Sequence, residues 1–259
     1  MNALRREKIR EFLRENGAAT IRELSTEFPE VSLMTIHRDL DALEQEGCIL
    51  KMRGGARYIA EAPKAEPAFP IRAVENLREK ERIAAFAARF VREGMTIFID
   101  AGTTGLALAR QLPDLAMTVF TSAPNIALAV SEKNEPFVHL CGGMLNRRNM
   151  ALSGSASLEY FDKVNIDVAF LVSSGYTPKA GFTCGKESEA QLKIRVISKA
   201  AAVVLLMDGS KFGKVLPFTF AGADDVDCFV TDGALEPELR AGLEEKDVRI
   251  FAGDDLTRP

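Results

Sequence analysis

The sequence contains no tryptophan, only two histidines and four cysteines, and no uninterrupted apolar run long enough to cross a membrane. The cysteines lie more than 40 positions apart, which argues against a zinc ribbon or a redox dithiol and predicts reduced, buried thiols. His37 and His139 are too few for a histidine-based zinc site. The N-terminal stretch is charged throughout, so no secretory signal is expected. We therefore predict a cytoplasmic protein without a metal or cofactor.

The composition is that of a globular protein, with 47% hydrophobic and 27% charged residues among 259. A formal net charge of −4 argues against non-specific coating of nucleic acid, although a local basic feature can still bind it. Three prolines between Ala60 and Pro70 indicate a semi-rigid, extended linker. The predicted organisation is an N-terminal domain over residues 1–58, a linker over 59–73 and a larger domain over 74–259.

The N-terminal domain has the pattern of three short helices followed by a hairpin. Apolar spacing predicts a first helix over residues 3–15, a second that a capping box at Thr20 opens, and a third that Ser32 caps. The third helix has an apolar stripe that should face inward, formed by Leu33, Ile36, Leu40 and Leu43. Residues 48–58 surround a Gly54-Gly55 turn, as a hairpin does. This order of elements predicts a winged helix-turn-helix.

The outward face of the third helix centres on Arg38, opposite the apolar stripe. A guanidinium there can read base edges or bind phosphates, and the hairpin adds three cations without an acid. Against this, the domain holds ten basic and ten acidic residues, and Asp41 and Glu44 would repel DNA if they faced it. A dimerisation or partner-binding module is the alternative. The candidate DNA-contacting residues are Thr20, Ser32, Met34, Thr35, His37, Arg38, Lys51, Arg53, Gly54, Gly55 and Arg57.

The larger domain alternates apolar runs with amphipathic stretches, which predicts βαβ units and a parallel sheet covered on both faces. The expected strands are Thr96–Ile99, Met117–Thr121, Phe137–Cys141, Val168–Val172, Ala202–Met207, Cys228–Val230 and Arg249–Phe251. The expected helices are Arg78–Val91, Leu106–Leu112, Ile126–Val130, Ser155–Phe161, Glu187–Ala200 and Pro237–Glu244. His139, inside an apolar run, is expected in the core, and the cysteines are expected to be packing residues.

Small and polar residues follow several of these strands and outline one crevice at their carboxyl ends. Thr103 and Thr104 would begin a helix whose N-terminus favours an anion. Asp100 could accept hydrogen bonds from sugar hydroxyls, and Lys211 could bind a phosphate. Ordinary βα loops also need such residues. The prediction of a pocket therefore depends on several such loops taken together. The chemistry suits a phosphorylated polyol.

Two sets of motifs, in order along almost the whole chain, resemble the DeoR/GlpR family of bacterial transcriptional regulators. Residues 32–47 with Arg53-Gly54-Gly55-Ala56 resemble its helix-turn-helix and wing, whereas residues 100–104, 121–125, 142–143 and 208–213 resemble its sensor domain. Departures from the family pattern are His37, Arg53 and Ala101.

The resemblance implies a repressor of sugar or polyol catabolism genes that a phosphorylated effector releases from a double-stranded DNA operator, as a homodimer or homotetramer. It implies a doubly wound α/β sensor fold similar to ribose-5-phosphate isomerases and CoA transferases. The implied effector-binding residues are Asp100, Gly102, Thr103, Thr104, Ser122, Asn125, Gly142, Gly143, Glu187 and Lys211.

The main alternative is a sugar-phosphate isomerase with an accessory N-terminal module. Such an enzyme needs a general base, for which Glu187 or Asp208 would be the candidates. The sequence has no paired acid–base motif and none of the common nucleotide-binding or nucleophile-elbow motifs. We therefore predict a regulator rather than an enzyme.

Overall fold

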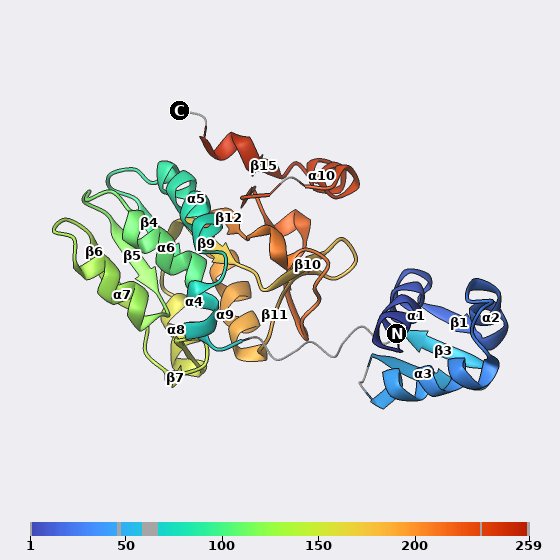
Figure 1. The fold of residues 1–259 in the computed structure, drawn as a ribbon. Coiled ribbons are helices and arrows are strands. Elements are labelled where there is room, and N and C mark those ends of the chain that lie inside the picture. The colour runs from blue at the N-terminus through green and yellow to red at the C-terminus, as the bar shows by residue number, and fades with distance from the viewer. Residues whose placement is uncertain (1, 46–47, 59–66, 234, 258–259) are drawn as a thin grey trace. The chain divides into compact units, whose positions relative to one another are not determined.

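The computed structural model describes residues 2–45, 48–58, 67–233 and 235–257. The chain forms two compact units, Met1–Lys64 and Ala65–Pro259, whose elements are labelled in Figure 1. Each unit has its own hydrophobic core. Among the described residues, no helix combines the length and apolar character that a membrane span requires.

The first unit has the expected three helices and hairpin. Its elements are α1 (Asn2–Asn16), β1 (Ala18–Thr20), α2 (Ile21–Glu27), α3 (Leu33–Gln45), β2 (Ile49–Met52) and β3 (Gly55–Tyr58). The sequence did not predict β1, which is too short to show a period and pairs with β3 in the order β1-β3-β2. Gly55 permits this pairing, because a Cβ there would lie 2.3 Å from the Ala19 carbonyl oxygen. The result is a winged helix-turn-helix.

Most of the expected apolar stripe on α3 is buried, since Ile36, Leu40 and Leu43 are at most 1% exposed. The expectation for Leu33 is wrong: its side chain is 56% exposed. Leu33 is the first residue of α3, and the buried stripe begins one turn later, at Ile36. The sequence also did not reveal that Asp39 is buried, where it accepts bonds from Arg5 Nε at 2.5 Å and Nη2 at 3.1 Å.

The second unit is built on a seven-stranded sheet with the order β15-β14-β12-β9-β4-β5-β6, and every pairing in it is parallel. Its strands are β4 (Thr96–Ile99), β5 (Thr118–Thr121), β6 (Phe137–Leu140), β9 (Ile166–Val172), β12 (Ala200–Leu206), β14 (Cys228–Thr231) and β15 (Arg249–Ala252). All seven expected strands are therefore confirmed, and their ends move by at most two residues.

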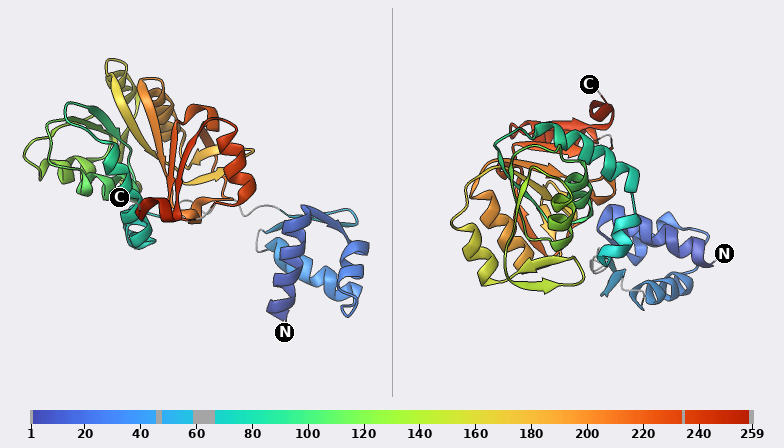
Figure 2. Two further views of the ribbon diagram at one scale, coloured as in Figure 1. Left: turned by 90° about the horizontal axis from the view of Figure 1, so that it is seen from above. Right: turned by 90° about the vertical axis from the view of Figure 1, so that its left-hand side faces the viewer.

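Helices cover both faces of the sheet, as Figure 2 shows from two further directions. One core lies between the sheet and α5 (Leu77–Ala87), α6 (Thr103–Gln111) and α7 (Pro124–Ser131). The other lies under α8 (Ser155–Phe161), α9 (Glu187–Ile197) and α10 (Pro237–Glu244). The expected helices are confirmed with shifted ends, and the end of the first continues as the 3₁₀ turn η1 (Ala88–Phe90). The predicted doubly wound α/β fold is thus confirmed.

Several short elements were not predicted. They are the three-stranded antiparallel sheet of β10 (Gly175–Thr177), β11 (Gly181–Cys184) and β13 (Phe218–Ala221), the hairpin of β7 (Met144–Asn146) and β8 (Ala151–Ser153), the 3₁₀ turns η2 (Gly209–Lys211), η3 (Ala223–Asp225) and η4 (Gly253–Thr257), and helix α4 (Phe69–Val74). Residues 59–66 of the expected linker lie outside the described residues. The expected extended conformation is wrong for α4, because Pro70 sits in its first turn, where proline needs no hydrogen-bonding N–H.

His139 also differs from expectation. It lies on β6, the edge strand of the sheet, and is exposed rather than part of the core. Its imidazole stacks on Phe120, with ring centroids 4.8 Å apart. An apolar run marks a strand, but it does not tell whether that strand is central or at an edge.

All four cysteines lie among the described residues, are buried and form no disulfide with one another. Burial raises the pKa of Cys141, and it raises those of Cys184 and Cys228 to about 12. We expect native protein at pH 8 to resist iodoacetamide, because all four thiols are buried and the thiolate is the nucleophile, and unfolded protein to react at all four positions. Intact-mass measurement checks this; rapid native modification would contradict it.

Candidate functional site

The outer face of α3 presents the side chains that the sequence predicted there. Arg38 and His37 are exposed, Met34 is 73% exposed and Thr35 is half-buried. Ile36 and Leu40 point into the core from the same helix. The helix can therefore offer a guanidinium, an imidazole and a thioether to a groove without losing a core contact.

Two of the predicted DNA-contacting hydroxyls are engaged in local structure. The Ser32 hydroxyl lies 2.9 Å from that of Thr35 and accepts the Thr35 N–H at 3.3 Å, which caps α3. Thr20 caps α2 in a full capping box, because its Oγ1 accepts the Glu23 N–H at 3.2 Å and Glu23 Oε2 accepts the Thr20 N–H at 2.7 Å.

We expect Thr20→Ala to lower the free energy of unfolding by about 1 kcal/mol, because it removes the N-cap of α2. Urea denaturation of the full chain followed by circular dichroism measures this. Thr26→Ala is the matched control, since its hydroxyl only donates to the Arg22 carbonyl within the same helix. Equal stability of the Thr20 variant and wild type would show that the cap contributes nothing.

The wing is the β2–β3 hairpin, and one of the three cations that the sequence predicted there is paired with an acid of α3. Lys51 forms an ion pair with Asp41, and its backbone N–H donates to Glu44 Oε1 at 2.8 Å. These contacts tie the two acids of α3 to β2. Arg53 and Arg57 are exposed on the hairpin, and Gly54 takes the left-handed turn conformation at φ 86°. Lys51 is therefore an internally paired cation, and the exposed arginines carry the positive charge of the wing.

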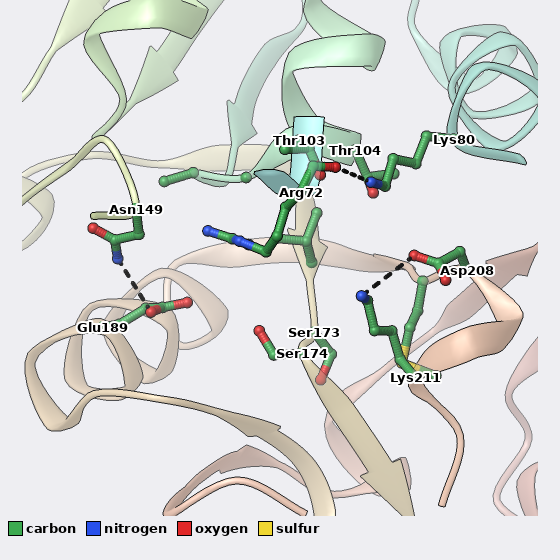
Figure 3. A pocket seen from close by; sticks show the side chains of 14 residues that line it. Arg72, Lys80, Thr103, Thr104, Asn149, Ser173, Ser174, Glu189, Asp208 and Lys211 are labelled. Atoms are coloured by element: carbon green, nitrogen blue, oxygen red, sulfur yellow. Dashed lines mark hydrogen bonds and ion pairs between the residues drawn. The ribbon is translucent and has the colours of Figure 1, made fainter. Parts of the chain in front are cut away.

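The second unit contains a cleft where the sequence predicted one, at the carboxyl ends of β4, β9 and β12. Figure 3 shows the side chains around it. It encloses about 450 Å³, including its open mouth. We call it the main cleft; its lining residues are Arg72, Lys80, Ala101, Gly102, Thr103, Thr104, Asn149, Val172, Ser173, Ser174, Glu189, Met207, Asp208 and Lys211.

One side of the main cleft is cationic. Lys211 Nζ lies 3.9 Å from Asp208 Oδ2. Lys80 is 3% exposed, and its Nζ donates to the carbonyls of Arg72 and Glu75 at 2.5 Å each. Burial lowers the pKa of Lys80, while the nearby Asp208 carboxylate opposes that shift.

The N-terminus of α6 lies in the same wall as these cations. The helix begins at Thr103 and Thr104, and Gly102 is its N-cap residue at φ 159°. A Cβ on Gly102 would meet Val172 Cγ2 at 2.9 Å, so glycine is needed for this close approach. The first-turn amides of a helix carry partial positive charge. This side of the cleft is therefore suited to an anion.

The opposite side offers hydrogen-bonding groups. Asn149 Nδ2 donates to Glu189 Oε2 at 3.3 Å, and Figure 3 shows the pair across the cleft from Lys211. Asn149 Oδ1 is buried and has no hydrogen-bond partner in the described part of the chain. A second cleft shares Ala101, Asn149 and Glu189 with the main cleft and is also lined by Asp100 and Ser122.

Asp100 has a different environment from the one the sequence suggested. Its carboxylate pairs with Lys193, which is 1% exposed, and accepts the Val172 N–H at 3.0 Å. Lys193 also donates to the Val172 carbonyl at 2.8 Å and lies 3.4 Å from Glu189 Oε1. These carboxylates raise the pKa of Lys193 even though its burial opposes the shift. Asp100 therefore anchors the loop that shapes the cleft.

Four other expected effector residues do not line either cleft. Asn125 keeps both amide atoms buried without a hydrogen-bond partner among the described residues. Gly142 accepts the Ser157 hydroxyl at 2.6 Å, and a Cβ on Gly143 would lie 2.6 Å from the Ser153 carbonyl oxygen. Glu187 is exposed on α9. Gly143 therefore permits close packing of the loop against β8 and α8, whereas a Cβ on Gly142 would meet no atom within 4 Å.

Sequence reasoning missed Arg72, Lys80, Asn149, Glu189 and Lys193. Arg72 lies in the proline-containing stretch, and Asn149 lies in an irregular loop. Lys80, Glu189 and Lys193 lie on amphipathic helices, where charged residues usually face solvent. One signal was present: Glu189 and Lys193 have the i, i+4 spacing that places both on one face of α9.

A winged helix-turn-helix joined to a doubly wound domain with a polar cleft defines a DNA-binding regulator with a sensor domain. Comparison with known families supports this class directly. Residues 5–62 match the DeoR-like helix-turn-helix domain, and residues 75–233 match the DeoR C terminal sensor domain. The chain belongs to the DeoR family of transcriptional regulators.

Similar proteins agree in their names. The HTH-type transcriptional regulator GlpR of Haloferax volcanii is 34% identical over 97% of this chain and 98% of its own length. The HTH-type transcriptional regulator IolR of Bacillus subtilis is 32% identical over 96% of this chain and 99% of its own. A ribose 5-phosphate isomerase A from Methanocaldococcus jannaschii matches 53% of this chain and 55% of its own, with 20% identity and a TM-score of 0.40.

The two family models and the curated relatives favour the regulator over the isomerase alternative. Of the two candidate bases, Glu187 lies outside both clefts, and Asp208 Oδ1 accepts hydrogen bonds from Asn76, at 3.1 Å, and from Ser210.

Among the described residues, no three His, Cys, Asp or Glu side chains cluster in a way that could hold a metal ion.

Proposed function

We propose that this chain is a sequence-specific repressor of sugar or polyol catabolism genes that a phosphorylated sugar or polyol releases from its operator. One observation carries the proposal. The main cleft has cations and a helix N-terminus on one side and the paired side chains of Asn149 and Glu189 on the other. A small molecule with a phosphate at one end and hydroxyl groups at the other matches both sides.

The phosphate end of the ligand would lie against Lys211 and the first turn of α6. Lys211 supplies a full charge at the rim, and Thr103 and Thr104 supply hydroxyls and backbone amides. Gly102 lets the loop approach Val172 closely and leaves room for the anion. Lys80 adds to the positive potential from beneath, where it holds the Arg72 carbonyl.

The hydroxyl groups of the ligand would lie toward Asn149 and Glu189. Both side chains line the cleft, so the Asn149 amide and the Glu189 carboxylate would supply hydrogen-bonding groups to the ligand hydroxyls. Ser122 lines the adjoining second cleft and extends the polar surface. Asp100 acts indirectly, since its carboxylate is held by Lys193.

The operator would be bound by α3 and the wing. Arg38, with Met34, Thr35 and His37 around it, would enter the major groove, and Arg53 and Arg57 would contact phosphates. One such unit reads one half-site, so a palindromic operator requires two copies of the chain in a homodimer or a homotetramer.

A thermal-shift screen of phosphorylated sugars and polyols, each beside its unphosphorylated parent, tests the proposal on the full-length protein. A ligand of the folded state raises the melting temperature by mass action, and we expect only phosphorylated compounds to do so. The hit should then weaken binding to the duplex that wild-type protein selects from a random library. Failure of every phosphorylated compound to shift the melting temperature would overturn the assignment of the cleft.

Lys211→Ala should weaken binding of that hit about 10-fold to 100-fold, because it removes a charged partner of the phosphate. Isothermal titration calorimetry measures the change. Lys163→Ala is the matched control, since Lys163 is an exposed lysine of the same unit that lines neither cleft. Equal affinities of the two variants would place the phosphate elsewhere.

A further inference from the structure

Helix α4 buries little apolar surface, and hydrogen bonds hold both of its ends to the rest of the second unit. It follows residues 59–66, the stretch that connects the two units in sequence. None of its six side chains, all of which the structure describes, is buried, and Ile71 and Val74 are 53% and 77% exposed. With little apolar burial, such a segment has low local stability. Its position therefore depends on the hydrogen bonds that hold it.

Those hydrogen bonds are concentrated at the two ends of the helix. At the start, the Phe69 N–H donates to the Arg148 carbonyl at 2.8 Å. At the other end, Lys80 Nζ donates to the carbonyls of Arg72 and Glu75 at 2.5 Å each. Asn76, two residues after the helix, donates from Nδ2 to Asp208 Oδ1 and Ser210 Oγ, both at 3.1 Å.

The groups that hold the end of α4 are also groups of the main cleft. Lys80 and Asp208 line it, and Asp208 lies 3.9 Å from Lys211 Nζ. The helix contributes its own side chain as well, because Arg72 lines the cleft. In Figure 3 the Arg72 side chain extends between Thr103 and Asn149, while its Nε donates to the Pro67 carbonyl at 2.9 Å. An anion in the cleft would therefore meet the side chain of α4 and the lysine that binds its carbonyls.

We infer that α4 is the element that transmits occupancy of the main cleft to the DNA-binding unit, and that Arg72 is its contact with the bound anion. The inference rests on the proposed function and adds the route of signalling. A bound anion attracts the Arg72 guanidinium, fixes α4 against the cleft and so restrains the chain segment that leads to the DNA-binding unit. The ligand then binds one arrangement of α4 more tightly than the other. Such a difference in affinity is what a ligand needs in order to shift operator binding.

Hydrogen exchange of the full-length protein, with inorganic phosphate as the probe, tests the inference without DNA. The reference buffer contains chloride at matched ionic strength. We expect phosphate to slow exchange in two segments, the first turn of α6 (103–106) and the region of α4 (71–76). Protection of α6 reports that the site is filled, and protection of α4 reports the coupling.

Two variants separate binding from transmission. In Arg72→Ala, at a phosphate concentration that saturates α6 protection, we expect the protection of α4 to fall at least fivefold. In Lys211→Ala, which removes a cleft cation outside α4, saturation should need more phosphate, but both segments should then be protected. Arg72→Lys should restore part of the α4 protection, because a cation remains on the helix.

The outcomes distinguish the inference from the proposed function. Protection of α6 with unchanged α4 in wild type, or full α4 protection in Arg72→Ala, would overturn the role of α4 and leave the anion site standing. Absence of protection in both segments would overturn the site itself. The same two variants, assayed for release of the selected duplex by the hit of the thermal screen, should show loss of release at saturation only for Arg72→Ala.

Discussion

Lys193→Met is expected to lower the free energy of unfolding of the second unit by about 3–5 kcal/mol. The change leaves the Asp100 carboxylate buried, at 2% exposure, without its cation. It also removes the donor to the Val172 carbonyl and the ammonium that lies 4.9 Å from the centre of the Phe220 ring. Urea denaturation of the full-length protein, followed by circular dichroism, measures the loss.

A double-mutant cycle gives the control for this prediction. Asp100→Asn together with Lys193→Met removes both charges, so the double variant should be less destabilised than the sum of the two single variants. Gln191→Met is a matched control on the exposed side of the same helix and should change stability by less than about 0.5 kcal/mol. Additive losses in the cycle would show that the two charges do not stabilise each other.

The ion pair of Lys193 and Asp100 also makes the stability of the protein depend on pH, in a direction that can be predicted. The pKa of Lys193 is raised in the folded state, so its contribution is fully present below the ordinary lysine value of 10.5 and is lost as the pH rises through the folded-state pKa. We expect wild type to lose stability relative to Lys193→Met above about pH 10.5. Denaturation at pH 8 and above pH 10.5 checks this, and a constant difference would contradict it.

Arg38→Ala is expected to reduce affinity for the selected duplex about 5-fold to 150-fold, which corresponds to about 1–3 kcal/mol. Arg38 is exposed at the centre of the outer face of α3, where a guanidinium can reach a guanine edge. The stability of the first unit should not change, because Arg38 is outside its core. Mobility shift at several salt concentrations measures affinity and its salt dependence.

Arg53→Ala and Arg14→Ala provide the comparison for that measurement. If Arg53 contacts phosphate, its loss should weaken selected and random duplexes alike and reduce the salt slope by about one unit. Arg14 is exposed on α1 and pairs with Glu11, so its loss should have little effect. If the Arg38→Ala variant bound the selected duplex as tightly as wild type does, α3 would not be the helix that reads the operator.

The sequence predicted elements well wherever burial imposes a strong pattern. Residues 228–231 form a strand that is buried on both faces, and its apolar run Cys228–Val230 could be recognised without a structure. The capping box at Thr20 was equally clear, because both of its partners lie within four residues. Helix α4 was missed, since its proline is as compatible with an extended linker as with a helix's first turn.

The candidate site also contains residues that the sequence predicted and residues whose environment it did not predict. Lys211, Thr103 and Thr104 were found because they follow strands, and parallel strands bring their carboxyl ends to one edge. Lys193 and Asp100 are 93 positions apart, so no local sequence pattern predicts that they pair. The pairing changes the interpretation of Asp100 from a ligand-binding group to an anchor of its loop.

The sequence alone determined the three helices and hairpin of the first unit, the seven strands of the parallel sheet, the long helices of the second unit and the family, because these depend on periodicity and on motifs that are local in the chain. The tertiary structure decided which polar groups meet: Lys51 with Asp41, Lys193 with Asp100, and Arg72 with the main cleft. The physical reason is that burial and charge pairing depend on distance in space. Packing brings such residues together across intervals of sequence that carry no pattern.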